Sequence, residues 1–285
     1  MRGSYLFSTV WALLVPGVWL AALVASPTTP GTVTAQTVEK RYDPLDQILD
    51  TYVREGLVYY RPLKAERAPL DAFIRNLDVS DTMRAAWPAA EQQAFWVNGY
   101  NALVLRTVIN AYPIQGAAAA YPANSIRQIP GAFERVQHAI GGETLTLDQI
   151  ETKIAAFGDA RLILALGRGA IGSPRLRSEA YRADRLDAQL NAVVKECADR
   201  RTCATIDRAA NTITMTPLMG WQAATFERTY PDTTGRWPTR SGIERAVLTM
   251  LLPHLLPGER DVIAGNTFEM KYGTFDWTLN DLTGR

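Results

Sequence analysis

The longest amphipathic stretch of the chain covers residues 94–113 and reads AFWVNGYNALVLRTVINAYP. Its apolar residues recur at the three- and four-residue spacing of a helix face, which predicts a helix buried over most of its surface. Asn98 and Asn101 interrupt that face and, being three residues apart, project from one side of the helix. A buried amide needs hydrogen-bond partners, so the sequence predicts a polar cluster inside its most hydrophobic element.

The rest of the chain alternates less regularly between helical and extended patterns. We expect helices over residues 43–53, 70–77, 179–194 and 242–252, and a short helix or turn over 218–226. Extended segments are expected at 57–60, at 161–166 and in a hairpin formed by 204–206 and 212–215. At 144–147 an extended piece leads into a helix that Thr146 or Asp148 can cap. This order predicts an α+β fold, a helix-rich single domain packed on a small mixed or antiparallel sheet.

The N-terminus has the features of an export signal. Arg2 supplies a positive region, residues 5–25 an apolar region, and residues 33–35 small side chains at a cleavage site. We expect a signal peptide over 1–35, a linker over 36–41, and a single globular domain over 42–285 in the periplasm or secreted. An uncleaved N-terminal anchor is the alternative, because the apolar run approaches the roughly 20 residues of a spanning helix.

Charge narrows the range of partners. Arg2 is the only charged residue among the first 35, so removing them changes 30 basic and 29 acidic residues to 29 of each. This balance argues against electrostatic binding of nucleic acid or of an anionic membrane surface. No nucleic acid is therefore expected, and no membrane contact beyond a possible N-terminal anchor.

The two cysteines, Cys197 and Cys203, lie close together in CADRRTC. In an exported protein this spacing favours a local disulfide, and it is not the C-x-x-C of a redox or metal pair. The only histidines, His138 and His254, have no neighbours in a metal-ligand pattern. We expect neither a metal nor a cofactor.

Residues 161–177 combine an apolar run with GRGAIGSPRLR. The glycines allow tight turns near Arg168, Ser173 and Arg177. No phosphate-binding loop fingerprint is present, and Ser173 before Pro174 is not the G-x-S-x-G elbow of a serine hydrolase. Binding of a carboxylate or another anion by these arginines remains open.

Four motifs in a fixed order carry a family resemblance. They are FWVNGYNAL at 95–103, LTLDQIE at 145–151, DARLILALGRGAIGSPRLR at 159–177 and FDWTLN at 275–280. With them, the chain from about Tyr42 to Asp281 resembles the family called domain of unknown function 547. The family occurs in bacteria and plants, and the resemblance implies a fold more readily than a reaction.

The departures from the family pattern concern its reactive residues. Members commonly carry a histidine in the segment expected as a strand, a cysteine at its end and a second cysteine before a Pro-x-Leu-Arg segment. The matching positions here hold Ile163, Arg168 and Ser173. Because a Cys/His pair supplies a thiolate nucleophile and its base, the resemblance implies a degenerate site. Cys197 and Cys203 lie in another segment and do not replace the pair.

The positions that match the family allow two interpretations. They are Asn98, Tyr100, Asn101, Glu151, Arg161, Pro174, Arg177, Trp277 and Asn280. In the favoured one, the asparagines, Glu151 and Arg161 form a buried hydrogen-bonded network that serves as scaffold. In the other, a pocket is lined by Asn98, Tyr100, Asn101, Arg161, Arg168 and Arg177, and Arg168 and Arg177 receive an anionic ligand.

The expected function is that of an uncharacterised exported protein, a non-catalytic or degenerate binding or envelope-associated domain. Its partner would be a small anionic ligand or an envelope protein. The alternative is a hydrolase that uses Ser173 or Glu151, with asparagine amides as oxyanion donors. Ser173 would then need a general base within hydrogen-bond reach, and His138 and His254 are the only imidazoles in the chain.

Overall fold

The structure is a computed structural model that describes residues 1, 3–4, 40–201 and 203–282. Contacts divide the chain into two units, Met1–Val38 and Glu39–Arg285, and the second contains every described helix and strand. Apart from residues 1, 3 and 4, the expected signal peptide lies outside the described residues, as does the linker before residue 40. Within the described part, no helix is both long and apolar enough to span a bilayer.

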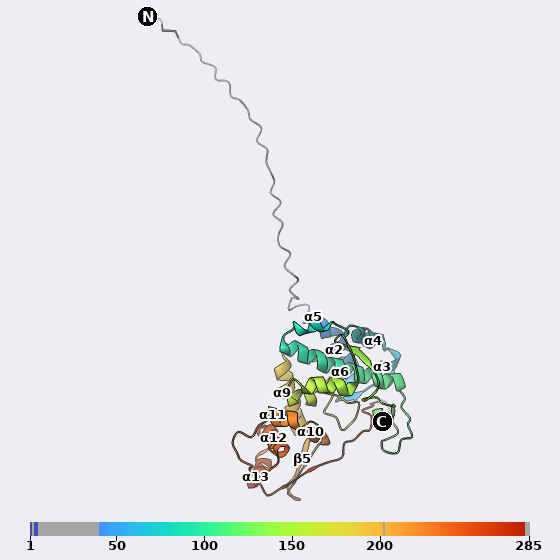
Figure 1. Ribbon diagram of the computed structural model, residues 1–285, viewed down its shortest axis with the longest axis vertical. Coiled ribbons are helices and arrows are strands. Elements are labelled where there is room, and N and C mark those ends of the chain that lie inside the picture. The colour runs from blue at the N-terminus through green and yellow to red at the C-terminus, as the bar shows by residue number, and fades with distance from the viewer. Residues whose placement is uncertain (2, 5–39, 202, 283–285) are drawn as a thin grey trace. The chain divides into compact units, whose positions relative to one another are not determined.

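Helices dominate the first part of the larger unit. η1 (Lys40–Tyr42), α2 (Asp43–Tyr52), α3 (Tyr60–Ala65), α4 (Ala68–Arg75) and α5 (Asp81–Ala85) precede the long α6 (Ala89–Ala111), and β1 (Val53–Arg54) pairs with β2 (Leu57–Val58). Both α3 and α4 pack on α6 (Figure 1). α6 begins directly after Pro88, and Pro113 follows its last residue by two positions, as expected because proline cannot continue a helix.

A hairpin and two helices follow a loop that contains η2 (Ile126–Gln128). The hairpin joins β3 (His138–Ile140) to β4 (Glu143–Leu145), and α7 (Leu147–Ala155) and α8 (Ala160–Leu164) come next. The Thr146 hydroxyl accepts a hydrogen bond from the Gln149 amide while the Gln149 side chain accepts one from the Thr146 amide. This reciprocal capping box confirms Thr146 as the start signal of α7.

The C-terminal part combines helices with a three-stranded sheet. It contains α9 (Leu186–Asp199), β5 (Ala204–Asp207), β6 (Thr212–Met215), α10 (Pro217–Trp221), α11 (Ala223–Thr229), α12 (Gly242–Leu251), η3 (Leu252–His254), α13 (Pro257–Gly265) and β7 (Glu269–Tyr272). The sheet order is β5-β6-β7, with β5 antiparallel and β7 parallel to β6. The expected hairpin and the helix-rich α+β fold with a small mixed sheet are thus confirmed.

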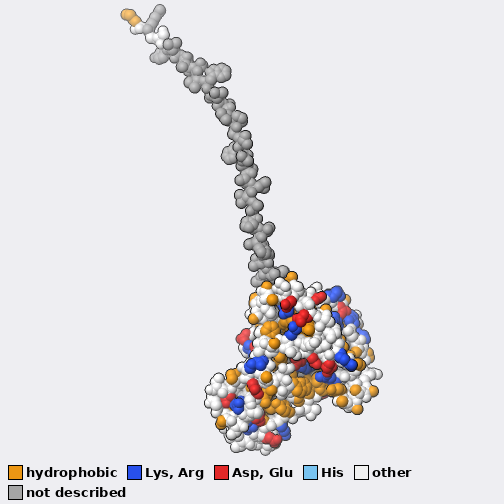
Figure 2. Space-filling model, viewed as in Figure 1, with side chains coloured by type: hydrophobic (Ala, Val, Ile, Leu, Met, Phe, Trp, Pro, Cys, Tyr) orange, Lys and Arg blue, Asp and Glu red, His pale blue; other side chains and the backbone are white. Residues whose placement is uncertain are grey.

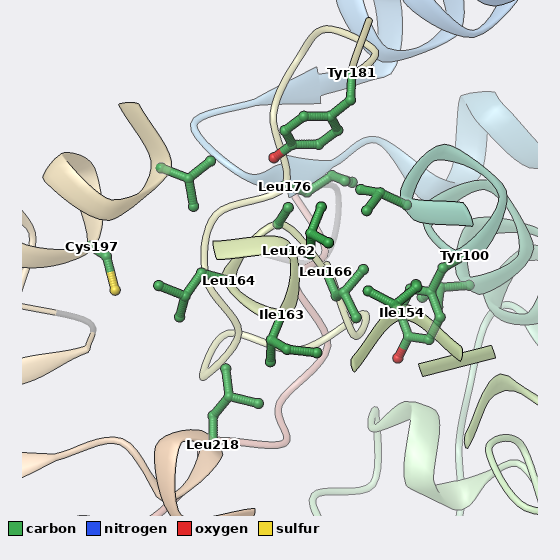
Figure 3. Close-up of a cluster of buried hydrophobic side chains, with 14 of the residues drawn as sticks. Tyr100, Ile154, Leu162, Ile163, Leu164, Leu166, Leu176, Tyr181, Cys197 and Leu218 are labelled. Atoms are coloured by element: carbon green, nitrogen blue, oxygen red, sulfur yellow. The ribbon is translucent and has the colours of Figure 1, made fainter. Parts of the chain in front are cut away.

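Two local predictions were wrong. Residues 161–166 do not form a strand, because α8 covers most of them and begins where the Asp159 carboxylate accepts from the Arg161 amide. The spacing of hydrophobic residues cannot show whether a short, continuous apolar run forms a buried strand or a buried helix. Figure 3 shows Ile163 pointing towards Leu218 of α10. The helix expected over 179–194 begins only at Leu186.

The two cysteines connect the end of α9 to the start of the sheet. Cys197 and Cys203 lie at disulfide distance, with Cα atoms 5.3 Å apart, and both are buried. In the space-filling view, charged side chains of both signs are spread over the visible face, and hydrophobic side chains gather between its upper and lower parts (Figure 2).

Candidate functional site

The two asparagines of α6 bind backbone groups. Asn98 donates from Nδ2 to the Tyr181 carbonyl at 2.7 Å and accepts from the Tyr181 amide at 2.9 Å. Asn101 donates to the Ala165 carbonyl at 3.1 Å and accepts from the Gly167 amide at 2.8 Å. The three partner residues lie outside regular secondary structure. Each buried side-chain amide therefore hydrogen-bonds backbone groups that lie outside helices and strands. These hydrogen bonds hold an irregular segment of the chain against α6.

Two of the arginines predicted to bind a ligand are paired with carboxylates. Arg161 lies 2.8 Å from Asp159 and 2.7 Å from Asp187, and Arg177 lies 2.7 Å from Glu179. The network expected between Arg161, the asparagines and Glu151 is not formed, because these groups have separate partners. The pocket that contains Arg168 is not lined by Asn98, Asn101, Arg161 or Arg177.

A pocket of about 260 Å³ surrounds the remaining candidate, Arg168. Its walls are formed by Arg127, Phe133, Asp148, Glu151, Thr152, Arg168, Trp221, Gln222 and Trp277. Asp148, Glu151 and Thr152 come from the first turns of α7, while the aromatic residues come from three segments distant in the chain. Two predicted site residues, Arg168 and Glu151, are thus brought together in one cavity.

An ion pair forms the buried side of this pocket. Arg168 Nη2 lies 2.7 Å from Glu151 Oε1, and the two side chains are 3% and 13% exposed. Gln222 donates to the same carboxylate oxygen at 2.9 Å. Burial alone would lower the pKa of Arg168, but the Glu151 carboxylate raises it above its ordinary value, so the guanidinium stays charged.

Asp148 supplies a second carboxylate three residues before Glu151. Within residues 40–201 and 203–282, no hydrogen-bond donor reaches its carboxylate, which keeps contact with solvent. Partial loss of hydration raises the pKa of Asp148, and the carboxylates of Glu134 and Glu151 raise it further. Asp148 is therefore the polar group of the pocket that is free to accept a donor from a ligand.

Aromatic rings make up much of the pocket wall. Trp277 stacks on Trp221 with ring centroids 6.1 Å apart and meets Phe133 edge-on at 5.8 Å. The Arg127 guanidinium carbon lies 4.5 Å from the ring centroids of both Phe133 and Trp277, and Arg127 also pairs with Glu134. Trp221 remains 51% exposed. A flat apolar group can thus stack at the rim of the pocket.

Backbone contacts place Trp277 in that wall. The Ile171 amide donates to the Thr278 carbonyl and the Gly172 amide donates to the Asp276 carbonyl, both at 2.8 Å. The glycine-rich loop after α8 is therefore hydrogen-bonded to the FDWTLN motif at 275–280 and holds it in place. Asn280 continues this anchoring, because its side chain accepts from the Tyr60 hydroxyl at 2.7 Å and donates to a backbone carbonyl.

Ser173 and the histidines do not come together. The Ser173 hydroxyl accepts from the Arg168 amide at 3.1 Å, whereas His138 Nδ1 lies 3.2 Å from Arg106 Nη2. His254 lies in η3. In the part of the chain that the structure describes, no histidine hydrogen-bonds Ser173, and no three His, Cys, Asp or Glu side chains gather as a metal site.

Tyr100 is the other predicted site residue close to this pocket. Its hydroxyl is buried without a hydrogen-bond partner among the described residues, and burial raises its pKa above the ordinary value. The charges of Arg168 and Glu151 both act on it. Arg127, Phe133, Trp221 and Gln222 were missed in the sequence, because no motif spacing connects them to α7.

These features define a helix-rich α+β domain with an aromatic-walled pocket built around a buried ion pair. Residues 85–196, from before α6 into α9, match the model of the family described as protein of unknown function, DUF547. The match supports the resemblance to this uncharacterised family over residues 85–196, which are less than half of the chain. No curated protein and no solved structure matches the chain.

Proposed function

We propose that the protein is an exported, non-catalytic binding domain whose pocket around Arg168 takes a small ligand. The ligand brings a hydrogen-bond donor or positive charge to Asp148 and a flat apolar face to Trp221 and Trp277. The observation that carries this proposal is the Asp148 carboxylate, which lacks a donor in an aromatic-walled cavity. Ligand sites combine apolar walls with a few such polar groups, and a cation is attracted to a tryptophan face.

The charges of the pocket support a donor or cation over an anion. Arg168 is paired with Glu151 and Arg127 with Glu134, so among the described residues that line the pocket Asp148 is the charged group without an ion pair. The charges of Arg127 and Arg168 still act on Asp148 and lower its pKa, but less than burial and the neighbouring carboxylates raise it. An anionic ligand, the partner expected from the sequence, would have to compete with Glu151 for a buried guanidinium. Breaking such a pair leaves a buried carboxylate uncompensated, which opposes anion binding at this place.

The groups at the family's reactive positions support binding over catalysis. The Ile163 side chain is packed in the core, and the Arg168 guanidinium occupies the buried side of the pocket. Ser173 has no imidazole partner among the described residues, and Glu151 already accepts from Arg168 and Gln222. The hydrolase alternative therefore lacks an unengaged nucleophile or base at the groups suggested for it.

The exported setting rests on the N-terminal signal features and on the close cysteine pair. Fractionation of cells that produce the full chain with a C-terminal tag tests it. We expect a tagged product shortened by the signal peptide, or full-length protein in the membrane fraction if the segment is an anchor. Recovery of the full-length protein in the cytoplasmic fraction would contradict export.

Three probes that share a phenylethyl group and end in an ammonium, a hydroxyl or a carboxylate test the ligand chemistry. Calorimetric titration with 2-phenylethylamine, 2-phenylethanol and 3-phenylpropanoate should give the tightest binding for the amine. Asp148→Asn should weaken amine binding about tenfold or more, because a charge-assisted hydrogen bond is lost. Trp277→Ala should weaken all three probes by removing a stacking face.

Asp78→Asn is the matched control, since Asp78 is an exposed carboxylate outside the pocket. It should leave amine binding unchanged. Tighter binding of the propanoate than of the amine, or no saturable amine binding at millimolar concentration, would contradict the proposed ligand class. Turnover of ester or amide substrates that is lost in Ser173→Ala would favour the hydrolase instead.

A further inference from the structure

A second cavity lies among the C-terminal helices and has a volume of about 640 Å³. Its lining residues are Arg236, Trp237, Leu252, Pro253, Arg260, Ile263 and Ala264. It shares no residue with the pocket around Arg168. The volume falls in the range of small-molecule sites, so the cavity is large enough for a ligand of its own.

The walls of this cavity are apolar and held in place by the fold. Trp237 is 4% exposed and Ile263 of α13 is 1% exposed. The Asp232 carboxylate accepts from the Thr234 hydroxyl at 2.7 Å and from the Trp237 amide at 3.5 Å, which fixes the loop that carries the tryptophan. The wall is therefore preformed, and a ligand would not have to order it.

Two arginines give the cavity a net positive charge. Among the described residues, neither Arg236 nor Arg260 forms an ion pair, and the single hydrogen bond of the Arg260 guanidinium goes to the Pro253 carbonyl at 3.3 Å. By contrast, Arg127 and Arg168 at the other pocket both face carboxylates. Unpaired guanidinium groups beside an apolar wall favour an anion, and their planar shape matches a carboxylate.

We propose that this cavity binds an amphiphilic carboxylate. Its apolar body lies along the accessible side chains of Leu252, Pro253 and Ala264, which the buried Trp237 and Ile263 support from behind, and its carboxylate is held by Arg236 and Arg260. A neutral amphiphile would gain the apolar contacts without the charge interaction, and a cationic one would be repelled by both guanidinium groups. The proposal is independent of the function assigned to the pocket around Arg168, because it rests on other residues and another charge.

Titration of the protein with decanoate, decan-1-ol and decylamine, each below its aggregation concentration, tests this inference. Decanoate should bind most tightly and decylamine least. The double variant R236A/R260A should weaken decanoate binding about a hundredfold, because each of the two lost charged hydrogen bonds contributes roughly tenfold. Its affinity for decan-1-ol should change little.

Two further variants separate a site effect from a loss of folding or of overall charge. R61A/R75A removes two exposed arginines from α3 and α4 and should leave decanoate binding unchanged. Ala264→Phe adds a ring at the cavity lining without changing charge, and should weaken decanoate and decan-1-ol alike. Thermal melting of each variant checks that it is folded.

Any of three results would overturn the proposal. They are equal affinity for decanoate and decylamine, unchanged decanoate affinity in the folded R236A/R260A variant, and no saturable decanoate binding by the wild type. Asp148→Asn should not alter decanoate binding, whatever its effect on the amine probe. This comparison makes failure of one site distinguishable from failure of the other.

Discussion

Arg168 and Glu151 form an ion pair in which the arginine is buried and the glutamate is partly buried, with Nη2 and Oε1 2.7 Å apart. It joins the first turns of α7 to the loop that follows α8. Because both ions lose hydration on folding, such a pair adds little net stability, but removal of one partner is costly. The pair thus fixes how two pocket walls meet.

Arg168→Ala should lower the free energy of unfolding by about 2–4 kcal/mol, because it leaves the partly buried Glu151 carboxylate without its cation. Adding Glu151→Gln should recover part of this loss, since the uncompensated charge is then absent. Urea denaturation of both single variants and the double variant measures the coupling. Lys195→Ala removes the cation of an exposed pair, 64% and 47% exposed, and should change the unfolding free energy by about 0.5 kcal/mol or less. A loss from Arg168→Ala no larger than that from Lys195→Ala would contradict the prediction.

Asn98→Ala and Asn101→Ala should each lower the free energy of unfolding by about 2–4 kcal/mol, because each leaves a backbone amide and a carbonyl unsatisfied in the core. Hydrogen exchange gives a residue-specific check. The Tyr181 amide should exchange faster in Asn98→Ala, and the Gly167 amide in Asn101→Ala.

The exposed Asn110 of α6 provides a matched control for these two variants. Its side chain accepts from Arg67 at 2.8 Å at the surface, so Asn110→Ala should change the unfolding free energy by about 0.5 kcal/mol or less. Equal losses in all three variants, or unchanged protection of the Tyr181 and Gly167 amides, would show that the asparagines do not anchor the irregular segments.

Sequence patterns predicted the parts of the fold that depend on neighbouring residues. The period of α6 and the Thr146 cap of α7 are local, and the structure has both. The partners of Asn98 and Asn101 could not be predicted, because they are backbone groups 83 and 66 residues away. Nearly every residue has the same backbone amide and carbonyl, so the sequence does not indicate which of them a side chain will bind.

The candidate site was only partly visible in the sequence for the same reason. Arg168 and Glu151 were singled out through family motifs, and Asp148 only as a possible helix cap. Trp221 and Arg127 belong to segments without a recognisable motif and reach the pocket through tertiary packing. The strand expected over 161–166 failed because a six-residue apolar run suits a buried helix equally well.

His138 should make the protein less stable as the pH falls from 6.5 towards 4. Burial and, to a smaller extent, the positive charge of Arg106 together lower the pKa of His138 from 6.5 to about 4. Between these values the unfolded chain binds a proton that the folded chain does not, so the free energy of unfolding rises with pH. Once the pH is below the pKa of His138 in the folded protein, the free energy of unfolding has fallen by up to about 3 kcal/mol because of this group.

His138→Gln keeps an acceptor for Arg106 and removes the titrating ring, so its stability should depend less on pH across that window. Denaturation at several pH values measures the difference in slope between variant and wild type. An NMR titration of the His138 ring follows the pKa directly. Equal slopes, together with a ring that titrates near 6.5, would contradict the prediction.

Gly172→Ala should disturb the pocket through the backbone. A Cβ at residue 172 would lie 2.6 Å from the Asp276 amide nitrogen and 3.0 Å from its carbonyl oxygen, so the segment that carries Trp277 must move. We expect a loss of about 1–3 kcal/mol in unfolding free energy, altered near-ultraviolet circular dichroism and weaker binding of 2-phenylethylamine. Gly265, the last residue of α13, provides the matched control. A Cβ there would lie 3.9 Å from its nearest neighbour, the Thr267 hydroxyl, so Gly265→Ala should be neutral or stabilise by up to about 1 kcal/mol. The prediction would be wrong if Gly172→Ala were as stable as Gly265→Ala and kept the wild-type spectrum. Trp277 would then be positioned by something other than contact between the loop after α8 and residue 276.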